Sequence, residues 1–178
     1  MIKQSEIIGL PVLSKNGEKV GLVREVIYSK KRFRVLGLLI SDKSIFKDAE
    51  IIKFCSIKSI GKDAVFVEDC KVVEKSSSDI EISSIIMSDN KSIIEEEVLT
   101  EDGESLGHIK DILLDENKGK IMGFILTDGF IDDIKDGRNV LPNDLGITFG
   151  EDVLIVNDEL KDKFYKYKNE YKKLLELL

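Results

Sequence analysis

One turn of this chain gathers four cations around a single aromatic residue and is its best candidate for binding chemistry. The residues are Lys30, Lys31, Arg32, Phe33 and Arg34. Cations at a turn can contact phosphate groups, and an aromatic ring can stack on a nucleobase. The segment is therefore a candidate contact for RNA or a ribonucleoprotein, with a solvated turn as the alternative.

A second candidate for chemistry is the acidic segment formed by residues 128–136. Asp128, Asp132, Asp133 and Asp136 could offer oxygen ligands to Ca²⁺ or Mg²⁺. Their spacing differs from that of an EF-hand loop, and the bidentate glutamate of such a loop is missing. We expect a solvated loop, and we predict no metal site and no cofactor.

Residues for catalysis are sparse. His108 is the only histidine, and no nucleophile–base motif or glycine-rich phosphate loop accompanies it. Cys55 and Cys70 lack CxxC spacing and a nearby histidine, so we interpret them as reduced thiols that behave as small apolar residues. We predict that the protein is not an enzyme and has no evident small-molecule substrate.

These residues lie on two copies of one pattern. Residues 12–42 align with residues 98–128 at a shift of 86, and residues 50–69 align with residues 139–158 at a shift of 89. The pairs include Gly17/Gly103, Gly21/Gly107, Gly37/Gly123 and Glu25/Asp111. Glu25 and Asp111 are expected to accept hydrogen bonds near a turn. His108 corresponds to Leu22 in this alignment, so the copies do not share a histidine at this position.

Each copy is predicted to form short strands. The expected strands are 20–28, 35–41, 51–54 and 64–68 in the first copy, and 106–114, 121–127, 140–141 and 153–157 in the second. Asn16-Gly17 and Asp102-Gly103 predict type I′ turns before them. Gly37 and Gly123, in mid-strand, indicate a bend or a close backbone approach. A bend suits a small sheet that curls into a barrel.

The remaining segments are a linker and a tail. Residues 75–87 form a linker that packs in part, because isoleucines recur in it. Residues 159–178 are predicted to be an amphipathic helix with Asp158 as its N-cap. Its apolar stripe is expected to dock on the protein's own barrels, or alternatively on a partner through Phe164, Tyr167 and Tyr171.

Charge is divided unevenly along the chain. Residues 1–75 carry 15 Lys/Arg and 10 Asp/Glu, a net +5, whereas residues 76–158 carry 6 and 20, a net −14. Such a dipole can bias the choice of partner. No apolar run is long enough to span a bilayer and the N-terminus does not resemble a signal peptide, so we expect a cytoplasmic protein away from membranes.

The repeated pattern resembles the PRC-barrel family. It consists of Asn/Asp-Gly-Glu, the step at Gly21/Gly107, the acidic pair Glu25/Asp111 and a glycine in the third strand. The family includes a barrel of the photosynthetic reaction centre and the C-terminal barrel of RimM. The resemblance implies an all-β fold of two tandem small barrels, residues 1–74 and 88–158, followed by the helix. It also implies a non-enzymatic adaptor that binds proteins or itself, with an RNA- or ribosome-associated factor as the alternative.

Overall fold

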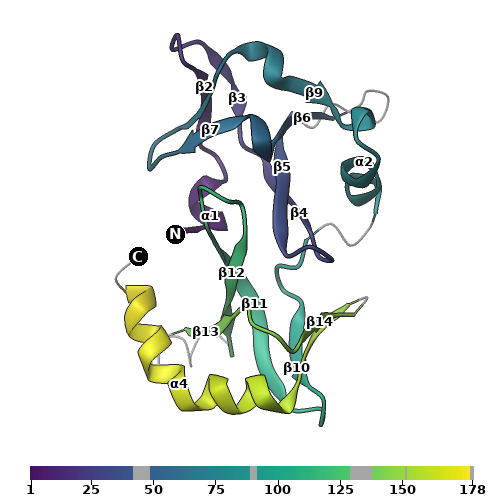
Figure 1. Ribbon diagram of the computed structural model, residues 1–178, viewed down its shortest axis with the longest axis vertical. Helices are drawn as coiled ribbons and strands as arrows, with labels where there is room; N and C mark the ends of the chain where they lie inside the picture. Colours follow the sequence, from purple (N-terminus) through teal and green to yellow (C-terminus); the bar gives the residue numbers. More distant parts are fainter. Residues whose placement is uncertain (42–48, 89–91, 129–137, 151, 177–178) are drawn as a thin grey trace. The chain divides into compact units, whose positions relative to one another are not determined.

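The chain divides into two compact units in a computed structural model that describes residues 1–41, 49–88, 92–128, 138–150 and 152–176 (Figure 1). The N-terminal unit consists of residues 2–91 and 115–120. The C-terminal unit consists of Met1, residues 92–114 and residues 121–178. Residues 75–87 pack with the N-terminal unit, and so do residues 115–120, a hairpin turn of the second copy.

The N-terminal unit contains two sheets. One has the strand order β3-β2-β8-β7 and the other β4-β5-β6-β9. Strands β2 and β8 pair in parallel, whereas the other pairs are antiparallel. The elements are β1 (Ile2–Lys3), α1 (Gln4–Ile7), β2 (Pro11–Ser14), β3 (Lys19–Leu22), β4 (Glu25–Ser29), β5 (Arg34–Ser41), β6 (Glu50–Lys53), η1 (Phe54–Ser56), β7 (Ile57–Ile60), β8 (Val65–Val67), η2 (Cys70–Val72), β9 (Val73–Lys75), η3 (Ser76–Ser78) and α2 (Ile80–Met87).

The C-terminal unit has a single sheet with the order β13-β12-β11-β10-β15-β14. Its strands β10 and β15 again pair in parallel. The elements are β10 (Glu97–Thr100), β11 (Ser105–Leu114), β12 (Ile121–Thr127), β13 (Asn139–Pro142), β14 (Ile147–Phe149), β15 (Val153–Val156) and α4 (Asp158–Glu176).

The two units share one strand order, which confirms the duplication. In this order, β6 and β5 correspond to β13 and β12, and β4 together with β3 corresponds to the single long strand β11. Strands β2, β8 and β7 then correspond to β10, β15 and β14. The predicted strand 20–28 is divided between β3 and β4, whereas its counterpart β11 is continuous with a register irregularity between Ile109 and Asp111. The sequence prediction missed β7 and β14, the last strand of each order.

Glycines allow backbones to approach closely in both units. A Cβ atom on Gly37 would lie 2.5 Å from the carbonyl oxygen of Ile52, and one on Gly123 would lie 2.8 Å from that of Leu141. The prediction of a close approach at these glycines is therefore confirmed. Because neither position could hold a Cβ without a shift of the neighbouring strand, glycine is required there.

The first hairpin turn of each copy differs from the predicted type I′. Positive φ occurs at Gly17 and Gly103, +82° and +84°, and not at Asn16 or Asp102. Both glycines donate a 2.9 Å hydrogen bond three residues back, to the carbonyls of Ser14 and Thr100. This is a longer loop that ends in a left-handed glycine. The hydroxyls of Ser14 and Thr100 favour it, since they accept from the backbone N–H groups four residues on.

Each unit places a helix on the same face of its sheet. In the N-terminal unit, Ile82 of α2 packs in a buried cluster with residues of β4, β5 and β6, which are Ile27, Leu39 and Ile51. In the C-terminal unit, Tyr171 of α4 packs against Leu113, Ile125 and Val140. These three residues are the repeat counterparts of the first three. The predicted linker is therefore a helix equivalent in position to the tail.

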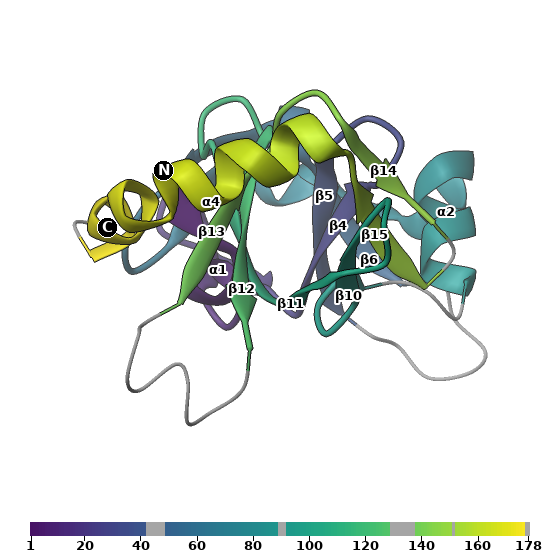
Figure 2. The same ribbon diagram turned by 90° about the horizontal axis from the view of Figure 1, so that it is seen from below.

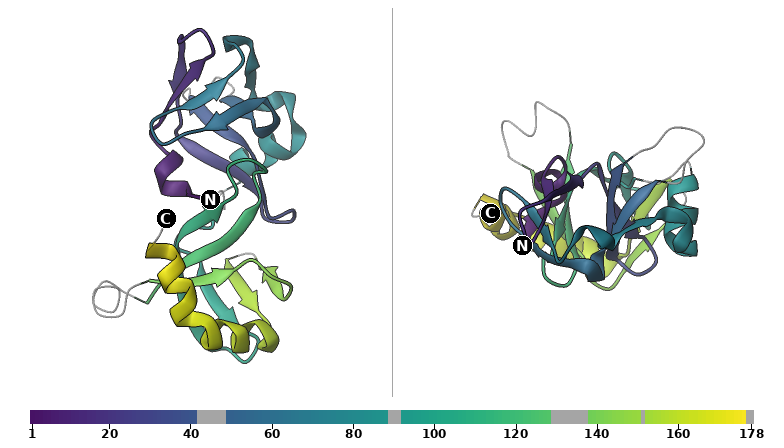
Figure 3. Two further views of the ribbon diagram at one scale, coloured as in Figure 1. Left: turned by 60° about the vertical axis from the view of Figure 1, so that its left-hand side comes forward. Right: turned by 90° about the horizontal axis from the view of Figure 1, so that it is seen from above.

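The tail helix is attached to its own unit (Figure 2; Figure 3, left, yellow). Leu160 and Phe164 are buried, which confirms docking within the chain. The N-cap is Asn157 and not the predicted Asp158, because the Asn157 Oδ1 accepts a 3.0 Å hydrogen bond from the N–H of Leu160. Among the described residues, no helix is long and apolar enough to cross a bilayer.

Candidate functional site: a groove in the N-terminal unit

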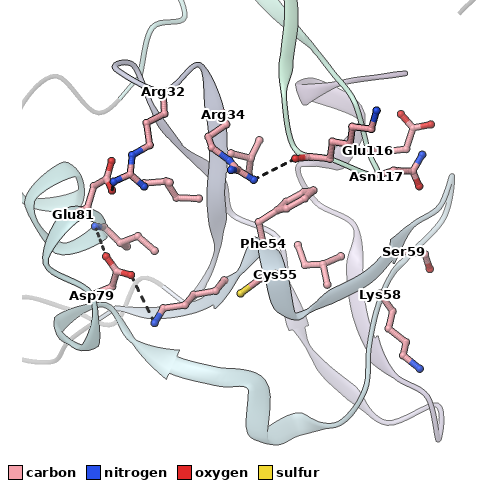
Figure 4. A pocket seen from close by; sticks show the side chains of 16 residues that line it. Arg32, Arg34, Phe54, Cys55, Lys58, Ser59, Asp79, Glu81, Glu116 and Asn117 are labelled. Atoms are coloured by element: carbon pink, nitrogen blue, oxygen red, sulfur yellow. Dashed lines mark hydrogen bonds and ion pairs between the residues drawn. The ribbon is translucent and has the colours of Figure 1, made fainter.

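A groove of about 650 Å³ opens on the surface of the N-terminal unit (Figure 4). It lies among the start of β5, η1, β7, the start of α2 and the segment 115–120. Its lining residues are Arg32, Arg34, Val35, Leu36, Lys53, Phe54, Cys55, Ile57, Lys58, Ser59, Asp79, Glu81, Ile82, Glu116, Asn117 and Lys118. The volume is within the range of ligand sites.

Phe54 forms the apolar part of the groove together with Leu36 and Ile57, all three partly exposed. Phe54 begins η1, directly after β6, so its ring is placed by the end of a buried strand. Gly119 lies on this ring, because a Cβ atom there would come within 2.8 Å of it. The carbonyl of Gly119 accepts a 2.7 Å hydrogen bond from the N–H of Val35, which holds the two segments together.

Cations outnumber anions around this apolar centre. Five of the lining residues are Lys or Arg, and three are Asp or Glu. Arg34 extends beside Phe54 and donates from Nη2 to the carbonyl oxygen of Lys118 at 3.5 Å (Figure 4). In the described part of the chain, no carboxylate forms an ion pair with Arg34 or Lys118. Lys118 lies near Asp115, whose pKa it lowers, so Arg34 is the cation that gives the groove local positive charge without an acidic partner among the described residues.

The other side of the groove is an ion-pair network based on α2. Glu81 pairs with Arg32 at 3.2 Å and accepts from the hydroxyl of Ser29 at 2.8 Å. Lys53 contacts Glu74 at 3.1 Å and Asp79 at 3.7 Å. Its hydrogen bond to Glu74 raises the pKa of Lys53 above its usual value and lowers that of Glu74. This side is therefore close to electrically neutral.

The structure brings only part of the predicted basic turn to this site. Arg32 and Arg34 line the groove, whereas Lys30, Lys31 and Phe33 do not. Phe33 is partly buried, which reduces the ring surface available for stacking, and its backbone has a positive φ of +50°. Sequence reasoning missed the contribution of α2 and η1, since the ion pair between Arg32 and Glu81 joins segments distant in the chain.

Two of the three predicted partner-binding residues of the tail, Phe164 and Tyr171, pack on their own unit. Phe164 is 2% exposed, so its side chain is not available to a partner. Tyr171 is partly exposed and packs on the sheet, and its ring centre lies 6.2 Å from that of Tyr167. The Nζ of Lys166 lies 5.0 Å from the centre of the Tyr167 ring. Tyr167 and Tyr171 thus both keep partly exposed rings.

Residues considered for catalysis or metal binding are scattered. His108 is exposed on β11, and the described residues contain no cluster of three His, Cys, Asp or Glu side chains suited to a metal. Most of the acidic segment, residues 129–137, lies outside the described residues. Asp111 is buried and accepts a 2.8 Å hydrogen bond from the N–H of Ile112. Cys55 and Cys70 are free and exposed, rather than packed as apolar residues.

The C-terminal unit replaces the side chains that define the groove. At the shift of 89, Phe54, Cys55 and Lys58 correspond to Asn143, Asp144 and Ile147. Asn143 donates to the carbonyl of Ile121 at 2.7 Å, and Asp144 pairs with Lys163 of α4 at 3.3 Å. These polar residues are therefore occupied by contacts within their own unit.

The fold thus defines a mostly-β protein built from two copies of one strand order, each with a helix on its sheet. Residues 1–73 and 87–161 each match the family model of the PRC-barrel domain. The chain belongs to the PRC-barrel domain family, with two domains in tandem. A search of curated proteins found no match.

Proposed function

We propose that this protein is a non-enzymatic interaction module that binds a segment of a partner protein in the groove of its N-terminal unit. The supporting observation is the groove itself, in which Phe54 lies beside Arg34 and next to the edge strand β7. An accessible aromatic residue next to an arginine is typical of residues that dominate protein interfaces. The lining residues include no histidine that could serve as a general base for Cys55 or Ser59.

The proposal also assigns different duties to the two units. Where the groove has Phe54 and Cys55, the C-terminal unit has Asn143, which donates to the carbonyl of Ile121, and Asp144, which pairs with Lys163 of α4. We therefore expect the partner to contact the N-terminal unit alone at this site. The exposed thiols of Cys55 and Cys70 suit a reducing compartment, so we place this binding in the cytoplasm.

RNA binding is the second candidate, and it rests on the exposed side chains of Lys31, Arg32 and Arg34. Glu81 reduces the charge available from Arg32, and Phe33 is partly buried, so a protein partner is the better-supported choice. A ribonucleoprotein contact would be strongly weakened by salt, because it depends on phosphate neutralisation.

Cys55 allows a direct test, because it lies in the groove while Cys70 does not. A photo-crosslinker is attached to Cys55 in a full-length Cys70→Ser variant, and to Cys70 in a Cys55→Ser variant as the matched control. In lysate of the native cell, we expect a nuclease-resistant protein adduct from Cys55 and none from Cys70. Adducts to RNA, or the same adducts from both positions, would overturn the proposal.

A further inference from the structure

We infer that the partner segment is acidic, and that it binds in an extended conformation as an additional strand on β7. This inference rests on the proposed function, since it names the ligand chemistry and the binding mode of the same groove. It combines two features of the groove, an edge strand and uncompensated positive charge.

The first feature is the position of β7 in its sheet. Strand β7 pairs with β8 on one side, with Ile57 opposite Val67 and Ile60 opposite Val65, and it is the last strand of the order β3-β2-β8-β7. Its other side is an edge within the described part of the unit. Ile57, Lys58 and Ser59 of this strand also line the groove. An extended peptide can therefore hydrogen-bond to the edge and place side chains in the groove.

The second feature is the charge that remains after internal pairing. Glu81 compensates Arg32, Asp79 compensates Lys53 and Glu68 compensates Lys58. Lys118 lies near Asp115, whose pKa it lowers, and Glu116 also lines the groove, which leaves Arg34 as the cation without an acidic partner among the described residues. A guanidinium group binds a carboxylate with two parallel hydrogen bonds, so Arg34 favours Asp or Glu in the ligand. A basic ligand would meet like charge at the same place.

The side chains of an extended segment alternate between its two faces. A strand on β7 would thus present every second residue to the groove, where Arg34 and Phe54 lie side by side (Figure 4). Lys58 on the strand itself is 60% exposed but forms an ion pair with Glu68, so Arg34 is the cation that remains for the ligand. We therefore expect recognition to depend on acidic residues spaced two apart more than on overall composition.

The test uses the full-length protein and three capped, fluorescein-labelled peptides. These are an alternating Glu-Thr hexapeptide, the matching Lys-Thr hexapeptide, and the Glu-Thr peptide with N-methylated alternate amides. Fluorescence anisotropy should show binding of the first peptide at least tenfold tighter than of the other two, because N-methylation removes the amides that pair with an edge strand. The Glu-Thr peptide should also slow alkylation of Cys55 by iodoacetamide while leaving Cys70 unchanged.

Two variants with the same charge change provide the matched control. Arg34→Glu should weaken binding of the Glu-Thr peptide at least tenfold, whereas Lys31→Glu, on the same turn but outside the groove, should change it less than twofold. Arg34→Gln should reproduce most of the loss. Circular dichroism verifies that all three variants are folded. Equal loss in both Glu variants would show a general charge effect and overturn the inference.

Other outcomes separate this inference from the proposed function. A protein adduct at Cys55 without binding of the Glu-Thr peptide would overturn the acidic-strand inference and keep the proposed function. Tight binding of the N-methylated or Lys-Thr peptide would also overturn it. Sedimentation that shows an Arg34-dependent self-association would identify a second copy of the chain as the occupant of the groove. This result would also overturn the acidic-strand inference. Protection of Cys55 from alkylation by poly-uridylate, and not by the Glu-Thr peptide, would overturn both the acidic-strand inference and the proposed function.

Discussion

Gly9 and Glu95 occupy the same position of the repeat and share the left-handed backbone conformation, with φ values of +88° and +72°. Each donates its N–H to a carbonyl at matching positions of the repeat, Gly9 to that of Val23 at 2.8 Å and Glu95 to that of Ile109 at 2.7 Å. The two copies therefore keep one hydrogen bond and one backbone shape, although only glycine adopts that shape without strain.

Glu95→Gly is expected to stabilise the protein by about 0.5–1 kcal/mol, because it removes the strain of a left-handed non-glycine residue. The lost ion pair with Lys110 is exposed and should contribute little. Urea denaturation measures the change. Glu95→Ala removes the same ion pair and keeps the strain, so it should give no gain. Stabilisation by both variants would contradict the strain explanation.

Gly37→Ala and Gly123→Ala are each expected to destabilise the protein by about 1–3 kcal/mol, because the added methyl group overlaps a carbonyl of the neighbouring strand. Gly21→Ala is the matched control, since its Cβ would lie 3.5 Å from Ile40, an ordinary contact. Thermal unfolding followed by circular dichroism compares the three. A control as destabilised as the other two would show that loss of glycine itself, and not the close approach, is responsible.

The burial of α2 predicts different effects for two isoleucines on one helix. Ile82→Ala removes a side chain that is 2% exposed and should cost about 2–4 kcal/mol, whereas Ile80→Ala removes one that is 89% exposed and should change stability little. Chemical denaturation of both variants tests whether α2 is part of the N-terminal unit. Similar small effects would indicate that the segment behaves as a linker.

The attachment of α4 to its hairpin turn predicts a response to acid. Lys161 contacts Asp102 at 2.8 Å and Glu104 at 2.7 Å, and the hydroxyl of Tyr165 donates to Glu104 at 2.7 Å. The hydrogen bond from Lys161 lowers the pKa of Asp102 from its usual 3.8 to about 2 and lowers that of Glu104 from 4.5. Since both folded pKa values are depressed, this stabilisation is present above about pH 4.5 and is lost as the pH falls towards 2.

Lys161→Met should therefore reduce stability at pH 7 and flatten its decline between pH 5 and about pH 2. Unfolding monitored by tyrosine fluorescence at several pH values provides the measurement. Lys166→Met is a control on the same helix, because Lys166 lies near the ring of Tyr167 and not near these carboxylates. An unchanged pH profile in Lys161→Met would show that other groups determine the acid response.

Much of the fold follows from local sequence features. The repeat, the strand Ile121–Thr127 and the close approach at Gly37 and Gly123 were all predictable. Short apolar runs and the spacing of glycines encode them within a few residues of chain. The turn type and the helix N-cap were not predictable from the sequence, because a single backbone angle or a single hydrogen bond decides each of them.

The candidate site required the tertiary structure. The basic turn was visible in the sequence, yet its neutralisation by Glu81 and its position beside Phe54 depend on segments far apart in the chain. The role of α2 was equally hidden, because its isoleucines suit a packed linker as well as a helix on a sheet. The sequence by itself determined the duplicated β scaffold, since its periodicity is local. Only the tertiary structure decided where this groove lies, because side chains from distant segments must meet to form it.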